Sequence, residues 1–259
     1  MAKEPERILA KSDWPDLVRT IRARTPARLL AGRVGAAYRT ETQLELRDAH
    51  ANARDSVRAE LDLESTFGAA FIKEWGLFDA HTEAAEKNEY LLRPDLGRRF
   101  SAASRTEIMQ RCSSGNDLQV VVGDGLSVAA VCAQVPRLLP PLHEESRARG
   151  WRVGQTFVIH HCRVGILNEI GELLNPTVAV LLIGERPGLA TAESLSAYMA
   201  YRPCQPHSDA NRNLISNIHS RGLSTSDAVI RILNLAARMM TAQVSGSTLR
   251  EGLAALAEE

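Results

Sequence analysis

Three short runs of apolar, mostly β-branched residues constrain the fold of this chain more than any other feature. They are LQVVV (118–122), TFVIH (156–160) and VAVLLI (178–183). Continuous apolar runs of this length are typical of strands that are buried on both faces of a parallel sheet. Segments of helical length, 126–149 and 164–174, separate them. The alternation predicts a β-α-β-α-β unit, which is a Rossmann-like α/β domain with a mainly parallel sheet.

The residues before 116 instead show sequence patterns that are typical of helices. A helix is expected from Trp14 onward, with Asp13 as its candidate cap, and another over 40–61, which holds no proline or glycine. Apolar positions are sparse in 40–61, so much of its surface should be solvated or should cover a partner. A third helix is expected after the turn at 94–97. We therefore predict a helical N-terminal domain, 1–115, followed by a Rossmann-like domain, 116–259.

The end of the chain adds one more clear helix, in the segment STSDAVIRILNLAARMM (224–240). Either Ser226 or Asp227 could cap it. Its apolar residues recur at helical spacing, so one side should be buried; they are Val229, Ile232, Leu233 and Ala236.

Composition and charge exclude several classes of protein. Lys plus Arg and Asp plus Glu number 31 each, so the net charge is zero. A cluster of arginines within 19–33 has little aromatic interleaving, which favours a solvated or subunit-facing surface over nucleic acid. No apolar run approaches the ~20 residues of a membrane helix, and the first residues carry no apolar signal core. The four cysteines are dispersed, which argues against a zinc site or a redox pair.

Three loops should form a ligand site, because open parallel sheets bind ligands beyond the carboxyl ends of their strands. The loops are GDGLS (123–127), HHCRVG (160–165) and GERPG (184–188). Each is rich in glycine or polar groups and directly follows an apolar run. Glu185 and Arg186 lie at such a position, although charges there also occur simply as a solvated strand end.

These loops lack the motifs of several familiar ligand sites. GDGLS has no third glycine for dinucleotide binding, the chain has no P-loop, and Ser127 does not stand in a nucleophile elbow. His160 and His161 suggest a metal, but adjacent strand residues point to opposite faces. We expect no metal site there and expect one of the two to be a core histidine.

Several longer motifs resemble those of the ethanolamine ammonia-lyase light chain. They are RPDLGRR, VVVGDGLS, GQTFVIHHCRVGILNEIGELL, LLIGERPGLATAESLSAYMAYRP and NLISNIHSRGLS, and the N-terminal segment 25–57 is similar to that family's opening helices. The resemblance covers nearly the whole chain, in order. GERPG followed by S-L-S-x-Y and I-S-N-I-H is far more specific than any single glycine motif.

The resemblance implies a function shared between two subunits. The family converts ethanolamine to acetaldehyde and ammonia by radical chemistry. Its subunits hold base-on adenosylcobalamin between them, and the substrate pocket lies in the large, TIM-barrel subunit. We therefore expect no catalytic residue in this chain. The cofactor contacts fall on Val164, Glu185 and Leu214, although some relatives have cysteine at the last position.

The expected base-on form agrees with a missing motif. A cobalamin whose lower ligand is replaced by a protein histidine needs D-x-H-x-x-G. Segments 48–50 and 79–81 begin this pattern, but Ala53 and Ala84 stand where glycine is needed, and both segments lie in the part predicted to be helical.

The sequence also bears on the location of the protein and on two alternative functions. We expect a cytoplasmic protein; the longer leader associated with packaging into a bacterial microcompartment is missing, so packaging stays open. One rival is a self-sufficient Rossmann-type nucleotide enzyme, which would need a phosphate-binding loop. Another is an assembly protein without cofactor contact, which would have no use for GERPG.

Overall fold

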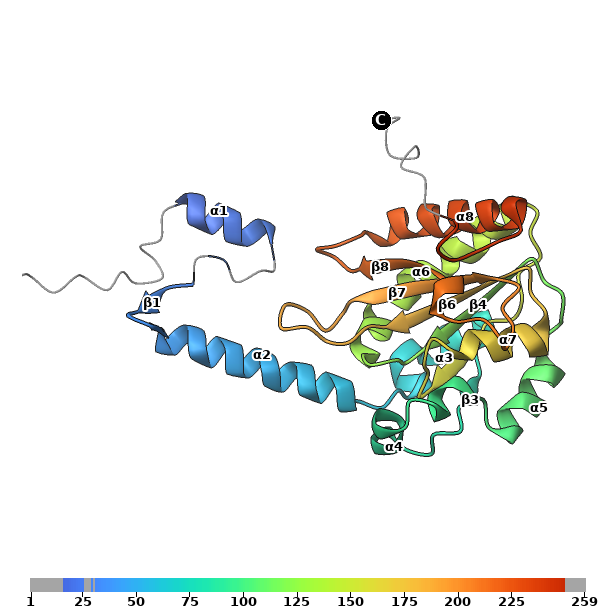
Figure 1. The fold of residues 1–259 in the computed structure, drawn as a ribbon, viewed down its shortest axis with the longest axis horizontal. Coiled ribbons are helices and arrows are strands. Elements are labelled where there is room, and N and C mark those ends of the chain that lie inside the picture. Colours follow the sequence, from blue (N-terminus) through green and yellow to red (C-terminus); the bar gives the residue numbers. More distant parts are fainter. Residues whose placement is uncertain (1–15, 26–28, 30, 250–259) are drawn as a thin grey trace, which may run out of the picture.

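The computed structural model describes residues 16–25, 29 and 31–249. Its centre is a six-stranded sheet with the strand order β3-β5-β4-β6-β7-β8 (Figure 1). The strands are β3 (Asp79–His81), β4 (Leu118–Gly123), β5 (Val158–His160), β6 (Val178–Gly184), β7 (Leu195–Tyr201) and β8 (Asn213–Ile218). The first four in the order are parallel, and β7 and β8 are antiparallel to their neighbours. The predicted α/β fold with a mainly parallel sheet is confirmed, and the antiparallel pair extends it.

Helices cover both faces of this sheet. One face packs against α3 (Leu63–Trp75), α6 (Val128–Ala148) and α8 (Thr225–Ala242), and the other against α5 (Ala102–Arg111) and α7 (Ile166–Leu174). Val120 and Val122 of β4 enter the first core, whereas Val121 enters the second. Side chains of a strand alternate between its faces, so an all-apolar strand must be covered on both sides.

Of the three helices predicted in the α/β part, α6 and α8 each show one feature that was not predicted. α6 continues through Pro136, Pro140 and Pro141, and the burial of its long apolar face offsets the backbone hydrogen bonds that proline removes. Ser224 caps α8, because its Oγ accepts from the Asp227 backbone N–H at 3.1 Å. The expectation of Ser226 or Asp227 as the cap is therefore wrong. The four residues predicted to line the buried side of α8 are all buried.

The N-terminal part contains the expected helices and several elements that were not expected. α1 (Asp16–Arg24), α2 (Thr40–Arg58) and α5 follow the prediction, while Asp13 and Trp14 lie outside the described residues. Unexpected are α3, α4 (Lys87–Leu92), the 3-10 helix Leu96–Arg98, the β1 (Arg33–Val34) and β2 (Ala37–Tyr38) hairpin, and β3. A second unexpected 3-10 helix, Asp209–Asn211, lies in the C-terminal part. β3 joins the sheet beside β5. The division into domains at residue 115 stays a prediction.

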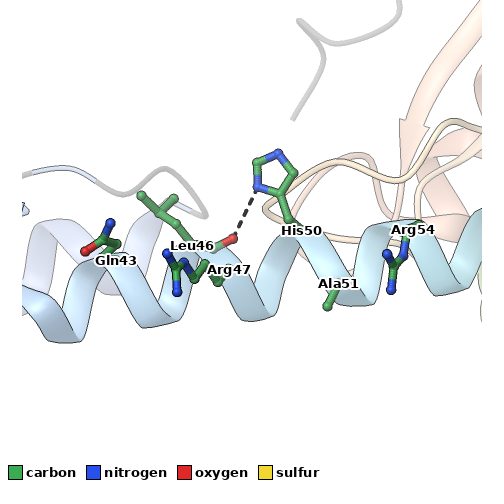
Figure 2. A pocket seen from close by; sticks show the side chains of 6 residues that line it. All are labelled: Gln43, Leu46, Arg47, His50, Ala51 and Arg54. Carbon is green, nitrogen blue, oxygen red and sulfur yellow. Dashed lines mark hydrogen bonds between the residues drawn. The ribbon is translucent and has the colours of Figure 1, made fainter.

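None of the 19 residues of helix α2 is buried, whereas α6 and α8, the helices of similar length, each bury several residues. It leaves the α/β body as a long arm (Figure 1), and Figure 2 shows the side chains along one stretch of it. The sparse apolar pattern of this segment predicted such exposure. No helix among the described residues is both long and apolar enough to cross a membrane.

Candidate functional site

The three predicted site loops meet at one edge of the sheet. Gly123 at the end of β4 is paired with Ile159 of β5 and Ile183 of β6, so the three carboxyl ends lie side by side. The loops after β4 and β6 touch closely: a Cβ on Gly184 would lie 2.0 Å from the carbonyl oxygen of Ser127. Any larger residue there would push the two loops apart.

A buried carboxylate fixes the loop after β5. Asp124, which is fully buried, accepts hydrogen bonds from the backbone N–H groups of His161 at 2.9 Å and Cys162 at 2.8 Å. Lys87, also buried, lies 3.4 Å from the same carboxylate and neutralises it. Burial, followed by the charge of Asp124, raises the pKa of the Cys162 thiol well above its usual value. This thiol therefore stays protonated and belongs to the framework of the site.

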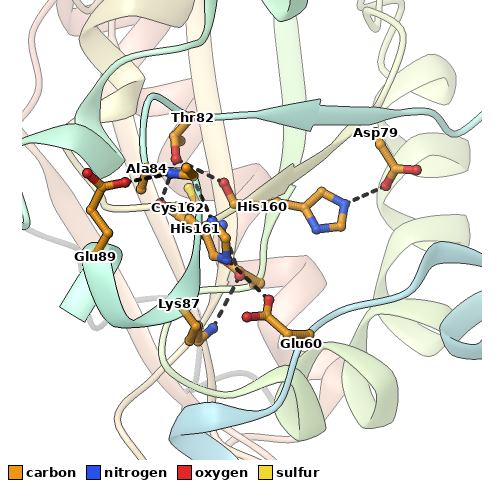
Figure 3. A network of polar contacts seen from close by, with 11 residues as sticks. Glu60, Asp79, Thr82, Ala84, Lys87, Glu89, His160, His161 and Cys162 are labelled. Atoms are coloured by element: carbon orange, nitrogen blue, oxygen red, sulfur yellow. Dashed lines mark hydrogen bonds and ion pairs between the residues drawn. The ribbon is translucent and has the colours of Figure 1, made fainter.

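Both adjacent histidines are buried and have protein partners (Figure 3). His160 Nε2 lies 2.6 Å from Asp79 Oδ1, and the ring stacks on His81 with centroids 4.5 Å apart. His161 has a left-handed backbone (φ 57°), and its Nε2 lies 3.1 Å from Glu60 Oε2. The sequence predicted that one of the two would be a core histidine, and both are buried. In the described part of the chain, no group of three or more His, Cys, Asp or Glu side chains is arranged to hold a metal ion.

One expectation about this region is wrong. Asp79 and His81, which begin the D-x-H-x-x-G pattern, lie in strand β3 and not in a helical region. Pairing of β3 with β5 overrides the helical texture of the surrounding sequence, because the strand completes the parallel part of the sheet. The pattern still ends in Ala84, and His81 packs on His160.

The structure places the three predicted cofactor contacts as follows. Val164 lies in the loop before α7 and is partly buried against the second core. Glu185 directly follows β6 and is half-buried, and its backbone N–H donates to the Ser194 carbonyl at 3.0 Å. Leu214 of β8 is 46% exposed. An apolar side chain this exposed on a sheet offers contact area to a ligand or a partner.

Tyr198 of β7 connects two of these residues and was not predicted as part of the site. It is paired in register with Leu214, and its hydroxyl lies close enough to the Glu185 carboxylate to feel its charge. Burial, followed by the charge of Glu185, raises the pKa of Tyr198 to about 12. The phenol therefore stays protonated beside Glu185. Val164 and Tyr198 both pack against the second core, and Leu214 shares the face of Tyr198 because the two are paired in register. The sequence feature that could have pointed to Tyr198 is its place in the S-L-S-x-Y motif.

Arg212 is a second residue that sequence reasoning missed. It lies two residues before Leu214, and its side chain is only 5% exposed. One guanidinium nitrogen donates to Asn168 Oδ1 at 2.8 Å, and another pairs with Asp209. Its Nε is buried and has no hydrogen-bond partner among the described residues. Nothing in the sequence around Arg212 marks it as buried, because it lies in a loop before an edge strand.

Fold and site together define the class: a three-layer α/β protein of Rossmann-like type, whose candidate binding face lies at the carboxyl ends of the parallel strands and continues onto β7 and β8. The family described as "Ethanolamine ammonia-lyase light chain (EutC)" matches residues 15–250. The chain belongs to this family, whose members are the small subunits of a two-subunit lyase.

Individual relatives agree with this assignment. The ethanolamine ammonia-lyase small subunit of Clostridium perfringens is 41% identical over 230 residues, covering 89% of this chain and 76% of that protein. The small subunit of Clostridioides difficile is 40% identical with the same coverage. That of Clostridium acetobutylicum is 38% identical, over 89% of this chain and 93% of the relative. The resemblance noticed in the motifs is thus confirmed.

Proposed function

We propose that this subunit binds base-on adenosylcobalamin together with a large TIM-barrel subunit, and that the assembled enzyme converts ethanolamine to acetaldehyde and ammonia. The observation that carries the proposal is the grouping of Glu185, Tyr198 and Leu214 on one open part of the sheet. This part offers a carboxylate with a protonated phenol nearby, next to an exposed apolar side chain.

The residues present fit such a cofactor. Glu185 can accept hydrogen bonds from the amide groups of a corrin or the hydroxyl groups of an adenosyl moiety, and the protonated hydroxyl of Tyr198 lies nearby as a possible donor. Leu214 and Val164 offer apolar contact. Since some relatives have cysteine where Leu214 stands, we propose that this position acts by packing and not by thiol chemistry.

The base-on form is supported by the histidines. The two segments that begin D-x-H-x-x-G lack its glycine. His81 packs against the ring of His160 in β5, and His50 lies on α2, with Nδ1 3.2 Å from the Leu46 carbonyl oxygen. Neither histidine lies at the face formed by Glu185 and Leu214, so we propose that the cofactor keeps its own lower base.

We propose that this subunit positions the cofactor and takes no part in the chemical steps. When bound, the cofactor supplies the radical that abstracts hydrogen from the substrate. The residues of this chain bind and orient it and exclude water from one side, and we assign none of them a catalytic role. Asp124 supports this indirectly because it fixes the loop that carries Val164. For location we propose the cytoplasm, with packaging into a microcompartment as an open variant.

The test is acetaldehyde formation from ethanolamine and adenosylcobalamin, measured with this chain and the large subunit separately and together. Activity only in the mixture is the expected result. Activity of this chain alone would favour a self-sufficient enzyme. No activity in a mixture whose subunits are folded and associated would favour an assembly role without cofactor.

A further inference from the structure

Arg212 is a buried cation whose hydrogen bonding is incomplete. Its side chain is 5% exposed, yet its Nε has no hydrogen-bond partner among the described residues. One terminal nitrogen of the guanidinium donates to Asn168 Oδ1 at 2.8 Å. The other pairs with Asp209, whose side chain is 89% exposed. Buried charges are held by partners that are buried with them, whereas the counter-charge of Arg212 lies in solvent.

Arg212 lies in the region that holds the proposed cofactor contacts. Its backbone is extended (φ −116°, ψ 146°), and it comes two residues before Leu214, so the two side chains belong to the same face of the sheet. Burial raises the pKa of Tyr198, and the charges of Glu185 and then of Asp209 raise it further. The partner of Arg212 is therefore close to the phenol that lies beside Glu185.

A second arginine, Arg98, connects Arg212 to the loop that carries Val164. The stem of Arg98 packs on Gly165, where an added Cβ would lie 2.8 Å from Arg98 Cγ. Burial lowers the pKa of the Arg212 guanidinium, the charge of Asp209 opposes this, and the charge of Arg98 lowers the pKa again. The two guanidinium groups are therefore close enough to repel each other.

The charges around this arginine pair, Arg98 and Arg212, favour an anion over a neutral acceptor. Asp95 follows closely before Arg98 in the chain, but it pairs with Arg93 at 2.8 Å. Asp209 can offset the charge of one arginine, and because its side chain is exposed, it can turn into solvent at little cost. A phosphate in its place can accept from Nε and a terminal nitrogen together, which is the bidentate geometry that arginine favours.

We propose that Arg212 and Arg98 bind the phosphate of the cofactor, and that this phosphate replaces Asp209 at the Arg212 guanidinium. The inference rests on the proposed function and deepens it. In adenosylcobalamin, the phosphodiester that joins the corrin to the nucleotide base is negatively charged, whereas the polar side chains of the corrin are neutral amides. Glu185 then faces amide or hydroxyl donors, so the two ends of the site set the direction in which the cofactor lies.

The test measures the affinity of the assembled enzyme for adenosylcobalamin from the change in corrin absorbance, with one substitution in this chain at a time. Arg212→Lys keeps the charge and loses the planar fork, so the Kd should rise about 10- to 100-fold. Asp209→Asn removes the competitor of the phosphate, so the Kd should fall about 2- to 5-fold. An ion pair that only supports the fold would weaken binding when either partner is changed. A rise in Kd for both variants would therefore overturn the proposal.

A second cofactor identifies the group that Arg212 contacts. Adenosylcobinamide keeps the adenosyl group and the corrin amides but lacks the phosphate and the base. Its Kd should be the same for Arg212→Lys as for the wild type. An equal loss of affinity for both cofactors would overturn the assignment to the phosphate.

Arg98→Gln tests the arginine pair independently if Arg212→Lys does not fold, as judged by far-UV circular dichroism. Arg98 is exposed, and its loss should raise the Kd for adenosylcobalamin about 2- to 5-fold. The matched control, Arg99→Gln, makes the same charge change at the next exposed position and should bind as the wild type does. Equal Kd values for these two variants would overturn the role of the pair.

The outcomes also separate this inference from the proposed function. If the wild-type subunits together bind no adenosylcobalamin, the proposed function fails and the phosphate site fails with it. If they bind it and none of the variants changes the Kd, only the phosphate site is overturned.

Discussion

The carboxyl edge of the sheet and helix α2 are both rich in charged residues, yet they use charge in opposite ways. At the edge, Asp124 and Lys87 are buried, and the carboxylate is held by two backbone N–H groups. On α2, Arg54 and Asp55 also pair, but their side chains are 73% and 71% exposed. Buried charges hold a structure in one geometry, whereas exposed charges are free to meet a partner. The charges at the edge thus fix the structure of the loops, whereas those on α2 are exposed to solvent.

The largest expected effect comes from breaking the buried pair. Asp124→Ala should lower the free energy of unfolding by about 3–5 kcal/mol, because it leaves Lys87 buried without its counter-charge and frees two backbone donors. Urea unfolding at pH 7 measures this. Asp55→Ala, the control on α2, should change it by less than about 0.5 kcal/mol. Similar losses in both variants would contradict the contrast between edge and arm.

Lowering the pH should destabilise the folded protein through a buried histidine. Burial, followed by the charge of Arg147, lowers the pKa of His143 from 6.5 to about 4. The unfolded chain therefore takes up this proton first as the pH falls. The contribution of neutral His143 to the free energy of unfolding is complete above pH 6.5 and is lost between about pH 6.5 and 4. It amounts to about 3 kcal/mol. His143→Gln should flatten the pH dependence of the unfolding free energy in this window; an unchanged slope would show that other groups cause it.

Binding should depend on the carboxylate at the edge. Glu185→Ala should weaken adenosylcobalamin binding to the assembled enzyme by about 10- to 100-fold, because a charge-assisted hydrogen bond contributes about 1.5–3 kcal/mol. The change in corrin absorbance on titration measures the affinity. Glu193→Ala, an exposed position in the same loop, is the control. Equal affinity in the Glu185 variant would remove this residue from the site.

Smaller effects should follow from residues that assist or surround the site. Tyr198→Phe removes the hydroxyl beside the Glu185 carboxylate. A polar group of this kind contributes about 0.5–1.5 kcal/mol, so cofactor affinity should fall about 2- to 10-fold. The same titration tests it, and a loss as large as that of Glu185→Ala would show that Tyr198 contacts the cofactor directly.

The smallest effect is expected on the arm. Leu44→Ala should change the free energy of unfolding of the isolated chain by less than about 0.5 kcal/mol, since the side chain is mostly exposed. The buried counterpart Leu138→Ala should cost about 2–5 kcal/mol. A large loss from Leu44→Ala would mean that this side chain packs within the chain.

The sequence by itself determined the parts whose patterns depend on local spacing. Runs of apolar residues predicted β4, β5 and β6, helical spacing predicted α8, and sparse apolar residues predicted the exposure of α2. The three site loops followed from the strands, because parallel strands end at the same edge of a sheet. The assignments of Val164, Glu185 and Leu214 came from the family resemblance and await their test.

Only the tertiary structure decided the features that join distant segments. β3 is three residues long and has no local strand pattern, so its place depends on pairing with β5. Asp124 and Lys87 are separated by 37 residues, and Glu185 meets Tyr198 only because β7 returns antiparallel beside β6. Burial and hydrogen bonding across the sheet are set by the packing of the whole chain, and no local sequence pattern encodes them.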